Sequence, residues 1–264
     1  MNLSPLRYPG GKSQYIPLLS NFANIIPHDR YIEPFAGGSS IALHFAINRA
    51  TPVVINDKDP AIFAFWHSVI NKTKKFIERI DSTLVDLKTW DQSKEILLNY
   101  YKRYNKFELG FATFFLNRCN FSGCLNANPI GGKKQFGRWK IDARFNKKDL
   151  IKRIKIIEQY KSLIKVSCLD ALDLVRMLSK NDLIYLDPPY YNQGKNLYKN
   201  FLKDEGHKRL YDALQLIPSP WIMSYDNCEF IRLLYKHKII RIEDIRYSFL
   251  NKKKNRELLI SDNF

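Results

Sequence analysis

The sequence predicts an α/β protein in which a doubly wound sheet is interrupted by a basic insertion. Short apolar segments alternate with helix-like segments in the first and last parts of the chain, as in doubly wound sheets. Between them, residues 58–162 carry 22 Lys and Arg against 10 Asp and Glu, a net charge of +12, whereas the other 159 residues carry only +5. Glycines, prolines and acidic side chains directly follow predicted strands, where open α/β sheets bind their ligands.

The first part of the chain predicts one βαβ unit. Residues 31–33 read as a strand that runs into a glycine-containing turn. A helix is expected over residues 39–49, and the short apolar strand 52–57 ends in Asp57.

The middle segment changes character halfway. Residues 61–104 predict helices, because apolar side chains recur near the helical spacing of 3.6, whereas residues 117–146 are rich in Asn, Gly and Lys and predict exposed loops. No internal repeat and no low-complexity linker is visible, so the insertion is expected to pack on the sheet domain.

The last part of the chain returns to strands. Residues 164–167 and 183–186 predict two strands separated by a helix over 171–178, and residues 221–224 and 257–260 predict two more.

Composition limits the class of protein. The 264 residues are 45% hydrophobic and 14% aromatic, which predicts a folded chain with a buried core. The formal net charge of +17 favours a polyanionic partner; on charge alone, a basic protein without such a partner is the alternative. Neither an apolar run of about 18 residues nor an apolar N-terminal signal is present, so a cytoplasmic protein with no membrane partner is expected.

The four cysteines predict neither a disulfide framework nor a metal site. Cys119 and Cys124 form one CxxxxC pair without a second Cys or His pair, while Cys168 and Cys228 lie far away in the sequence. Reduced thiols are expected, as in other intracellular proteins.

Two of the motifs that follow predicted strands indicate a nucleoside ligand. In Glu33-Pro-Phe-Ala-Gly-Gly-Ser39, glycines let the backbone approach a ligand at a helix start, although the pattern is not the GxGxxG dinucleotide fingerprint. Asp57 lies 20 residues after Gly37, at the position from which an acid binds ribose hydroxyls. A ligand-free turn and a solvated loop aspartate are the alternatives.

A third motif, Asp187-Pro188-Pro189-Tyr190, indicates recognition of a planar amino group. The two prolines end a strand in a stiff extended turn that directs the Asp187 carboxylate and the Pro188 carbonyl outward. Two acceptors beside the Tyr190 ring suit a planar group that carries an NH₂. The N-terminal stretch Arg7-Tyr-Pro-Gly-Gly-Lys12 is too short for a phosphate-binding Walker A loop and is inconclusive alone.

Five motifs in order resemble one family. RYPGGK (7–12), EPFAGGSS (33–40), a strand ending in Asp57, FFLNRCNFSG (114–123) and DPPY (187–190) resemble the Dam-type, class D12, DNA adenine-N6 methyltransferases of the α group, over nearly the whole chain. The resemblance implies a Rossmann-like S-adenosylmethionine-dependent methyltransferase sheet, formed by residues 1–57 and 163–264, with residues 58–162 as a helical and loop insertion for target recognition. It also implies double-stranded DNA as partner and S-adenosyl-L-methionine as cofactor.

The resemblance assigns the cofactor and catalytic residues one by one. Tyr8 stands where the family often has Trp, and Ala171 follows Asp170 where Phe is usual. The residues implied at the cofactor are Tyr8, Lys12, Glu33, Phe35, Ala36, Gly37, Asp57, Asp170 and Asp187. Those implied in catalysis are Asp187, Pro188 and Tyr190, which would accept the two N6 hydrogens of adenine and stack on the base.

Part of the middle segment resembles the start of target recognition in this family. Residues 126–139 depart from the pattern of well-known GATC readers, so the recognised sequence is left open. The DNA-binding candidates are Arg118, Lys133, Lys134 and Arg138 for phosphates, and Asn117 and Asn120 for base edges.

Alternative functions and partners stay open at the level of sequence. A methyltransferase acting on cytosine N4, on RNA adenine or on glutamine in a protein is the nearest rival, and a catalytically silent DNA-binding module is the rival from another class. Asp rather than Ser or Asn before Pro-Pro-Tyr favours adenine. Tyr191 and the polar stretch 192–203 are expected to form a mobile loop beside the pocket. A cognate restriction endonuclease and the oligomeric state are left open.

Overall fold

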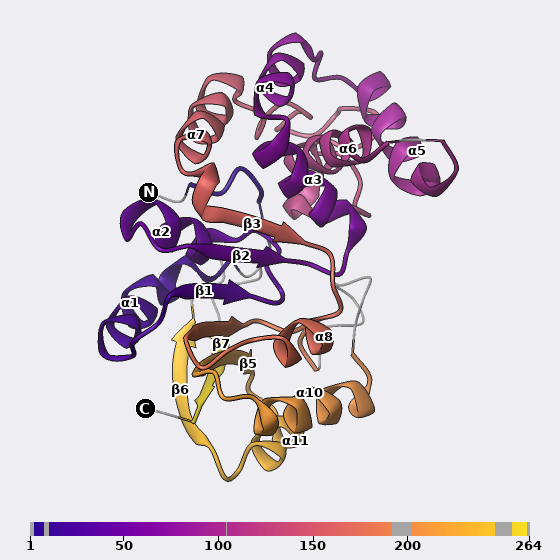
Figure 1. Ribbon diagram of the computed structural model, residues 1–264. Helices are drawn as coiled ribbons and strands as arrows, with labels where there is room; N and C mark the ends of the chain where they lie inside the picture. Colours follow the sequence, from indigo (N-terminus) through magenta and orange to yellow (C-terminus); the bar gives the residue numbers. More distant parts are fainter. Residues whose placement is uncertain (1–2, 8–10, 104, 192–201, 246–254, 263–264) are drawn as a thin grey trace.

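A seven-stranded sheet forms the centre of the computed structural model, which describes residues 3–7, 11–103, 105–191, 202–245 and 255–262 (Figure 1). The strand order is β3-β2-β1-β4-β5-β7-β6, in which the first five are parallel and β7 runs antiparallel to both of its neighbours. The strands are β1 (Arg30–Glu33), β2 (Val53–Asn56), β3 (Ile164–Ser167), β4 (Asp182–Leu186), β5 (Trp221–Asp226), β6 (Ile239–Ile245) and β7 (Asn255–Ser261).

Both faces of the sheet are covered, because alternate side chains of each strand point to opposite sides. In β4, Leu183 and Tyr185 pack into one core cluster, whereas Ile184 and Leu186 pack into another. The first cluster includes α1 (Ile16–Ile25) and α2 (Ser40–Asn48). The second includes α8 (Ala171–Arg176), α10 (Asp204–Leu216) and α11 (Glu229–Leu234). A doubly wound α/β fold is therefore confirmed.

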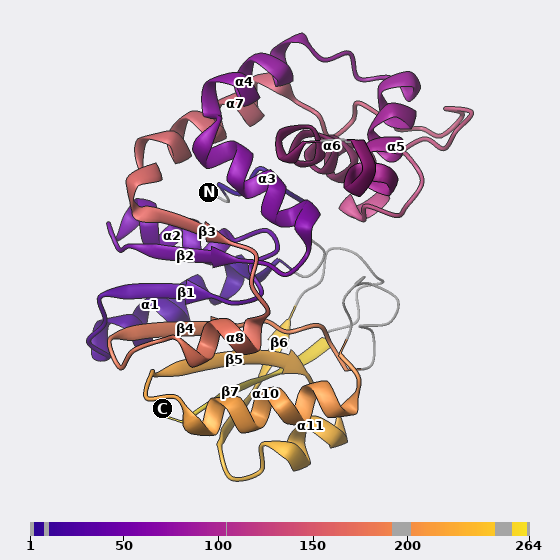
Figure 2. The same cartoon turned by 45° about the vertical axis from the view of Figure 1, so that its right-hand side comes forward.

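Five helices form a lobe beyond the β3 edge of the sheet (Figure 2). Phe65, Phe76 and Phe114 meet at its centre, with ring centroids 5.4–5.9 Å apart. These rings belong to the same core cluster as Tyr31 and Ile55 of the sheet, so the lobe and the sheet share one core. The helices of the lobe are α3 (Pro60–Asn71), α4 (Thr73–Ser82), α5 (Leu87–Arg103), α6 (Lys106–Cys119) and α7 (Lys147–Gln159).

Sequence periodicity located most elements but missed some. The helices expected over residues 61–104 are confirmed within the described residues 61–103 as α3, α4 and α5. The βαβ unit and the strands at 164–167, 183–186, 221–224 and 257–260 are also confirmed. Strand β6 and helices α1, α6, α7, α10 and α11 were not predicted, and α6 continues to Cys119, three residues into the loop expected over residues 117–146. The division at residues 57/58 and 162/163 into separate units stays a prediction.

Some expectations fall outside the described residues. These are the placement of Tyr8 and most of the loop predicted over residues 191–203. Within the described ranges, no helix is long and apolar enough to cross a membrane.

Candidate functional site

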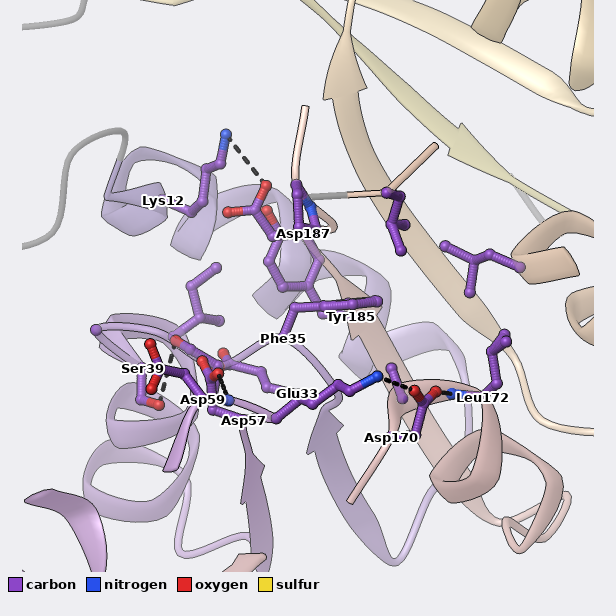
Figure 3. Close-up of a pocket in the computed structure, with 18 of the residues that line it drawn as sticks. Lys12, Glu33, Phe35, Ser39, Asp57, Asp59, Asp170, Leu172, Tyr185 and Asp187 are labelled. Carbon is purple, nitrogen blue, oxygen red and sulfur yellow. Dashed lines mark hydrogen bonds and ion pairs between the residues drawn. The ribbon is translucent and has the colours of Figure 1, made fainter. Parts of the chain in front are cut away.

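A cavity of about 440 Å³ opens at the carboxyl ends of β1, β2, β3 and β4 (Figure 3). Glu33 ends β1, Asp57 follows β2, Asp170 follows β3 and Asp187 follows β4, so the parallel strands bring four acidic residues to one edge. The apolar lining includes Phe35, Ala36, Ile41, Leu172 and Leu210. The volume of the cavity lies within the range of small-molecule binding sites.

Hydrogen bonds from neighbouring elements fix the conformation of the turn after β1. Gly37 has φ +46°, a left-handed conformation that glycine adopts without strain, and its carbonyl accepts a hydrogen bond from Trp66 Nε1 at 2.9 Å. Glu33 Oε1 accepts the Ala42 N–H at 2.8 Å and the Tyr31 hydroxyl at 3.1 Å. Burial raises the pKa of Glu33 to about 8, against the effect of these donors.

Asp57 links two turns at the cavity wall. Its Oδ2 accepts the Gly37 N–H and its Oδ1 accepts the Asp59 N–H, both at 2.9 Å. Burial raises the pKa of Asp57 to about 7, while these N–H donors act in the opposite direction. The carboxylate therefore supports the glycine turn and faces the cavity at the same time.

Asp170 begins helix α8 and pairs with Lys58. Its Oδ1 accepts the Leu172 N–H at 2.9 Å, and Lys58 Nζ lies 2.7 Å from its Oδ2. Burial acts to raise the pKa of Asp170, but the Lys58 ammonium and the N–H donor outweigh it and the pKa lies below its usual value. Figure 3 shows Asp170 on the side of the cavity away from Lys12.

Asp187 lies between the cavity and a buried polar cluster. Its Oδ1 accepts the Ser224 hydroxyl at 3.0 Å and lies 3.4 Å from Lys12 Nζ. Burial raises the pKa of Asp187 to about 6, whereas Lys12 acts to lower it. Asp187 and Pro189 line the cavity, while the Tyr190 hydroxyl turns toward Lys12 and Glu257. Pro188 is buried.

Sequence reasoning missed four residues at this site: Tyr15, Asn56, Ser224 and Glu257. Asn56 is buried, and its amide bonds to Pro34 O at 2.9 Å and to both main-chain groups of Leu169, which ties the turn after β1 to the loop after β3. Glu257 of β7 accepts hydrogen bonds from Lys12 and Tyr15. A single carboxylate within the apolar run Glu-Leu-Leu-Ile was the available sign of Glu257.

The two predicted base-reading asparagines are buried and hold the chain together. Asn117 accepts the Arg7 N–H at 2.7 Å and donates to Arg7 O and Gly123 O at 2.8 and 2.9 Å. Asn120 accepts from Trp90 Nε1 at 2.6 Å and donates to two carbonyls of the following loop. Both amides are occupied within the protein, so the structure does not bring them to the surface.

Arg118 also contacts the protein rather than the surface. Its Nε donates to Arg144 O at 2.7 Å and its Nη1 approaches Pro5 O at 3.4 Å. Burial lowers the pKa of Arg118 to about 10, and the neighbouring Arg7 and Arg153 act in the same direction.

Lys133, Lys134 and Arg138 are exposed on the loop that follows α6. Gln135 holds this loop, because its amide donates to Ile130 O and Gly132 O at 2.8 and 2.6 Å and accepts the Ile141 N–H at 2.9 Å. Two large aromatic side chains of the same loop, Phe136 and Trp139, are 84% and 63% exposed. The loop therefore presents cations and aromatic rings together.

The described side chains contain no group of three or more His, Cys, Asp or Glu arranged to hold a metal ion. All four cysteines are free thiols.

Two type II methyltransferases are similar in sequence to this chain over most of its length. It is 26% identical over 253 residues to the type II methyltransferase M.CviBI of Paramecium bursaria Chlorella virus NC1A, covering 92% of this chain and 90% of that protein. It is 25% identical over 210 residues to the type II methyltransferase M.MjaIII of Methanocaldococcus jannaschii, covering 72% and 70%. Among solved structures, an rRNA methyltransferase, AviRa, from Streptomyces viridochromogenes aligns over 99% of this chain and 90% of its own at 12% identity, with a TM-score of 0.38.

A family model of D12 class N6 adenine-specific DNA methyltransferases matches residues 8–256, from the N-terminal glycine motif to β7. That span contains the glycine turn, Asp57 and the Asp-Pro-Pro-Tyr motif. The chain therefore belongs to the D12 class N6 adenine-specific DNA methyltransferase family, and it is a site-specific DNA methyltransferase that uses S-adenosyl-L-methionine.

Proposed function

We propose that the cavity binds S-adenosyl-L-methionine and that Asp187, Pro188 and Tyr190 bind the target adenine at its mouth. The observation that carries this assignment is the position of Asp187. Its carboxylate lines the cavity, and among the described residues Ser224 and Lys12 both contact Oδ1, which leaves Oδ2 to accept an incoming N–H.

The cavity residues fit the chemical groups of this cofactor. Asp57 lines the cavity and would accept the two ribose hydroxyls, and Asp170, in the loop after β3, lines it together with the apolar Leu172, where an adenine would fit. Glu33 and Asp187 supply acidic groups for a cationic methionine end, with Phe35 and Ala36 beside them. When bound, the cofactor supplies an electrophilic methyl group on a sulfonium.

The protein's task is to orient the amino nitrogen of adenine. The N6 lone pair is delocalised into the ring, so two fixed acceptors are needed to direct it out of the ring plane. Asp187 and the Pro188 carbonyl accept the two N6 hydrogens, and the Tyr190 ring stacks on the base. Positive charge that develops on N6 is stabilised by the adjacent Asp187 carboxylate.

The basic loop after α6 is proposed to hold the DNA. A base within a duplex is out of reach of the cavity, so it must be flipped out at a cost of a few kcal/mol, offset by stacking and phosphate contacts. Lys133, Lys134 and Arg138 are exposed for phosphates, and Phe136 and Trp139 are exposed for stacking. Asn117, Arg118 and Asn120 are proposed to support this surface from within.

A partner endonuclease is a further part of this proposal. M.CviBI and M.MjaIII are type II methyltransferases, a class whose modification accompanies a restriction activity. We propose a cognate restriction endonuclease of the same site, and a cytoplasmic location, where DNA is accessible. An endonuclease that cuts the unmodified site and is blocked after treatment with this protein would identify the pair.

The function is tested by long-read sequencing of DNA from cells that express this chain. N6-methyladenine at one recurring sequence is expected with the wild type and not with Asp187→Ala. Methylation at cytosine N4, or in RNA alone, would contradict adenine in DNA as the target. Methylation of DNA by Asp187→Ala would contradict the assignment of Asp187. A wild-type chain that binds S-adenosyl-L-methionine in calorimetry but methylates no DNA would overturn the proposed function, and one that binds none would be a silent scaffold.

A further inference from the structure

A buried polar cluster on β7 and η1 (Lys12–Tyr15) lies behind the Asp-Pro-Pro-Tyr motif. Glu257 is 1% exposed and Lys12 is 6% exposed. Lys12 Nζ lies 2.7 and 2.9 Å from the two Glu257 oxygens, and the Tyr15 hydroxyl donates to Oε2 at 2.9 Å. The Tyr190 hydroxyl accepts from Lys12 and donates to Glu257 Oε1.

The cluster places one ammonium between two carboxylates. Lys12 is 2.7 Å from Glu257 but 3.4 Å from Asp187 Oδ1, so its closer ion pair is with Glu257. Buried charges interact strongly with partners at these distances. If Glu257 were uncharged, the attraction of Lys12 for Asp187 would be unopposed, and Lys12 would move toward the carboxylate that faces the cavity.

We propose that Glu257 is a positioning residue for methyl transfer, which holds Lys12 and the Tyr190 hydroxyl and so leaves Asp187 available to the target amino group. The inference rests on the proposed function, because it takes Asp187 as the acceptor of the N6 hydrogens. Glu257 acts through Asp187 and Tyr190 and does not contact the base.

Other groups face Asp187 and set its titration together with Glu257. Burial is the largest effect on the pKa of Asp187, which it raises; Lys12 lowers the pKa and Glu257 raises it. Neutralising Glu257 should therefore lower the pKa of Asp187. The titratable or charged groups that interact with Asp187 are Lys12 and Tyr15 of η1, Tyr31 and Glu33 of β1, Tyr185 of β4, Tyr225 of β5 and Glu257 of β7.

The experiment is single-turnover methyl transfer by Glu257→Gln, from pH 5 to pH 8.5, on a duplex that contains the methylated site. We expect the plateau rate to fall about tenfold or more, because the acceptor pair is displaced, and the acid limb to move to lower pH. Glu257→Asp, with a carboxylate one methylene shorter, should shift the limb in the same direction by less. It also carries the test if Glu257→Gln does not fold.

A second measurement does not depend on turnover. In cofactor-free protein labelled with ¹³C at aspartate Cγ, the Asp187 resonance, assigned by its loss in Asp187→Asn, should titrate at lower pH in the Glu257 variants than in wild type. Asp182→Asn is the control, since Asp182 is buried and paired with Arg30 at 2.7 Å but lies at the opposite end of β4. It should leave the Asp187 titration in place.

Different outcomes would contradict the role of Glu257 and the proposed function. An unchanged Asp187 midpoint and acid limb in both Glu257 variants would show that Glu257 only ties β7 to η1, and the inference would be overturned. A wild-type protein that transfers no methyl group to any DNA would instead overturn the proposed function.

Discussion

Asp187 is the residue on which the rate of methyl transfer should depend most strongly. Asp187→Ala should abolish methyl transfer, because one lost charge-assisted acceptor in the transition state costs roughly 3 kcal/mol or more. Affinities for cofactor and DNA should stay within about tenfold of wild type, since the carboxylate acts mainly on the flipped base and is only one of the acidic groups proposed at the methionine end of the cofactor. Single-turnover kinetics and equilibrium binding measure both effects.

The matched control for Asp187 is Asp212→Ala, an exposed aspartate on α10, which should leave the rate unchanged. Activity of Asp187→Ala above about a tenth of wild type would contradict the mechanism.

Asp57 should affect the cofactor instead of the chemistry. Its carboxylate accepts the Gly37 N–H, so Asp57→Ala removes both the ribose acceptor and a support of the glycine turn. The loss of a hydrogen bond to a charged group is worth about 1.5–3 kcal/mol of binding free energy. Calorimetry without DNA should show the weaker affinity. Asp173→Ala, on the exposed side of α8, is the control, and equal affinities for Asp57→Ala and Asp173→Ala would leave Asp57 without a role in binding.

At the scale of the elements, Asn117 joins the end of α6 to the N-terminal segment. Its buried amide makes three hydrogen bonds, so Asn117→Ala should lower the free energy of unfolding by about 2–3 kcal/mol. Urea unfolding measures the loss, with exposed Asn126→Ala as control. Sequencing of DNA methylated by the remaining folded Asn117→Ala protein should find the same methylated site as for wild type. A changed site with unchanged stability would restore Asn117 as a base-reading residue.

The loop after α6 should control how DNA binding depends on salt. The slope of log affinity against log salt concentration is about −0.9 for each phosphate that the protein neutralises. Changing Lys133, Lys134 and Arg138 together to Ala should therefore make this slope less negative by about two to three units. Filter binding or anisotropy over a salt series provides the slopes.

A second triple variant tests whether this effect belongs to the loop. Lys180, Arg232 and Lys236 are exposed and lie outside the helical lobe, so their replacement by Ala should leave the slope near wild type. Equal slopes for the two triple variants would move the DNA-binding surface to another part of the protein.

At the scale of the whole molecule, the acidic cavity should make the cofactor-free protein less stable as pH rises. Burial raises the folded-state pKa of Glu33 to about 8, of Asp57 to about 7 and of Asp187 to about 6. An acid with a raised folded pKa contributes stability that is present below its unfolded pKa, near 4, and is lost as pH rises through the folded value. The loss should therefore extend from about pH 4 to pH 8.

Glu33→Gln isolates this effect from other titrations. Urea midpoints measured from pH 5 to pH 8.5 should fall less steeply with pH in Glu33→Gln than in wild type, because one of the three contributions is gone. Parallel curves for the two proteins would show that Glu33 stays ionised in the folded state over the whole range.

The sequence predicted what parallel strands place together and missed what antiparallel pairing adds. Asp57 and Asp187 directly follow apolar strands, and parallel strands carry such residues to one edge whatever their separation in the chain. Glu257 reaches the site only because β7 inserts antiparallel between β5 and β6, a pairing of distant segments that no local pattern encodes. Likewise, a buried Asn117 and an exposed Asn126 look alike in sequence, since burial depends on tertiary packing.

The hydrogen bond from Trp66 to Gly37 bears on any exchange of target specificity between relatives. Trp66 belongs to α3, inside the segment proposed to face DNA, yet its indole N–H supports the turn at the cofactor cavity. A chimera joined at residue 57 would replace Trp66, which supports the turn at the cofactor cavity, together with the segment proposed to recognise DNA. Engineering of new specificities in this protein should therefore retain the host's α3 and graft only segments of the lobe that lie C-terminal to Asn71.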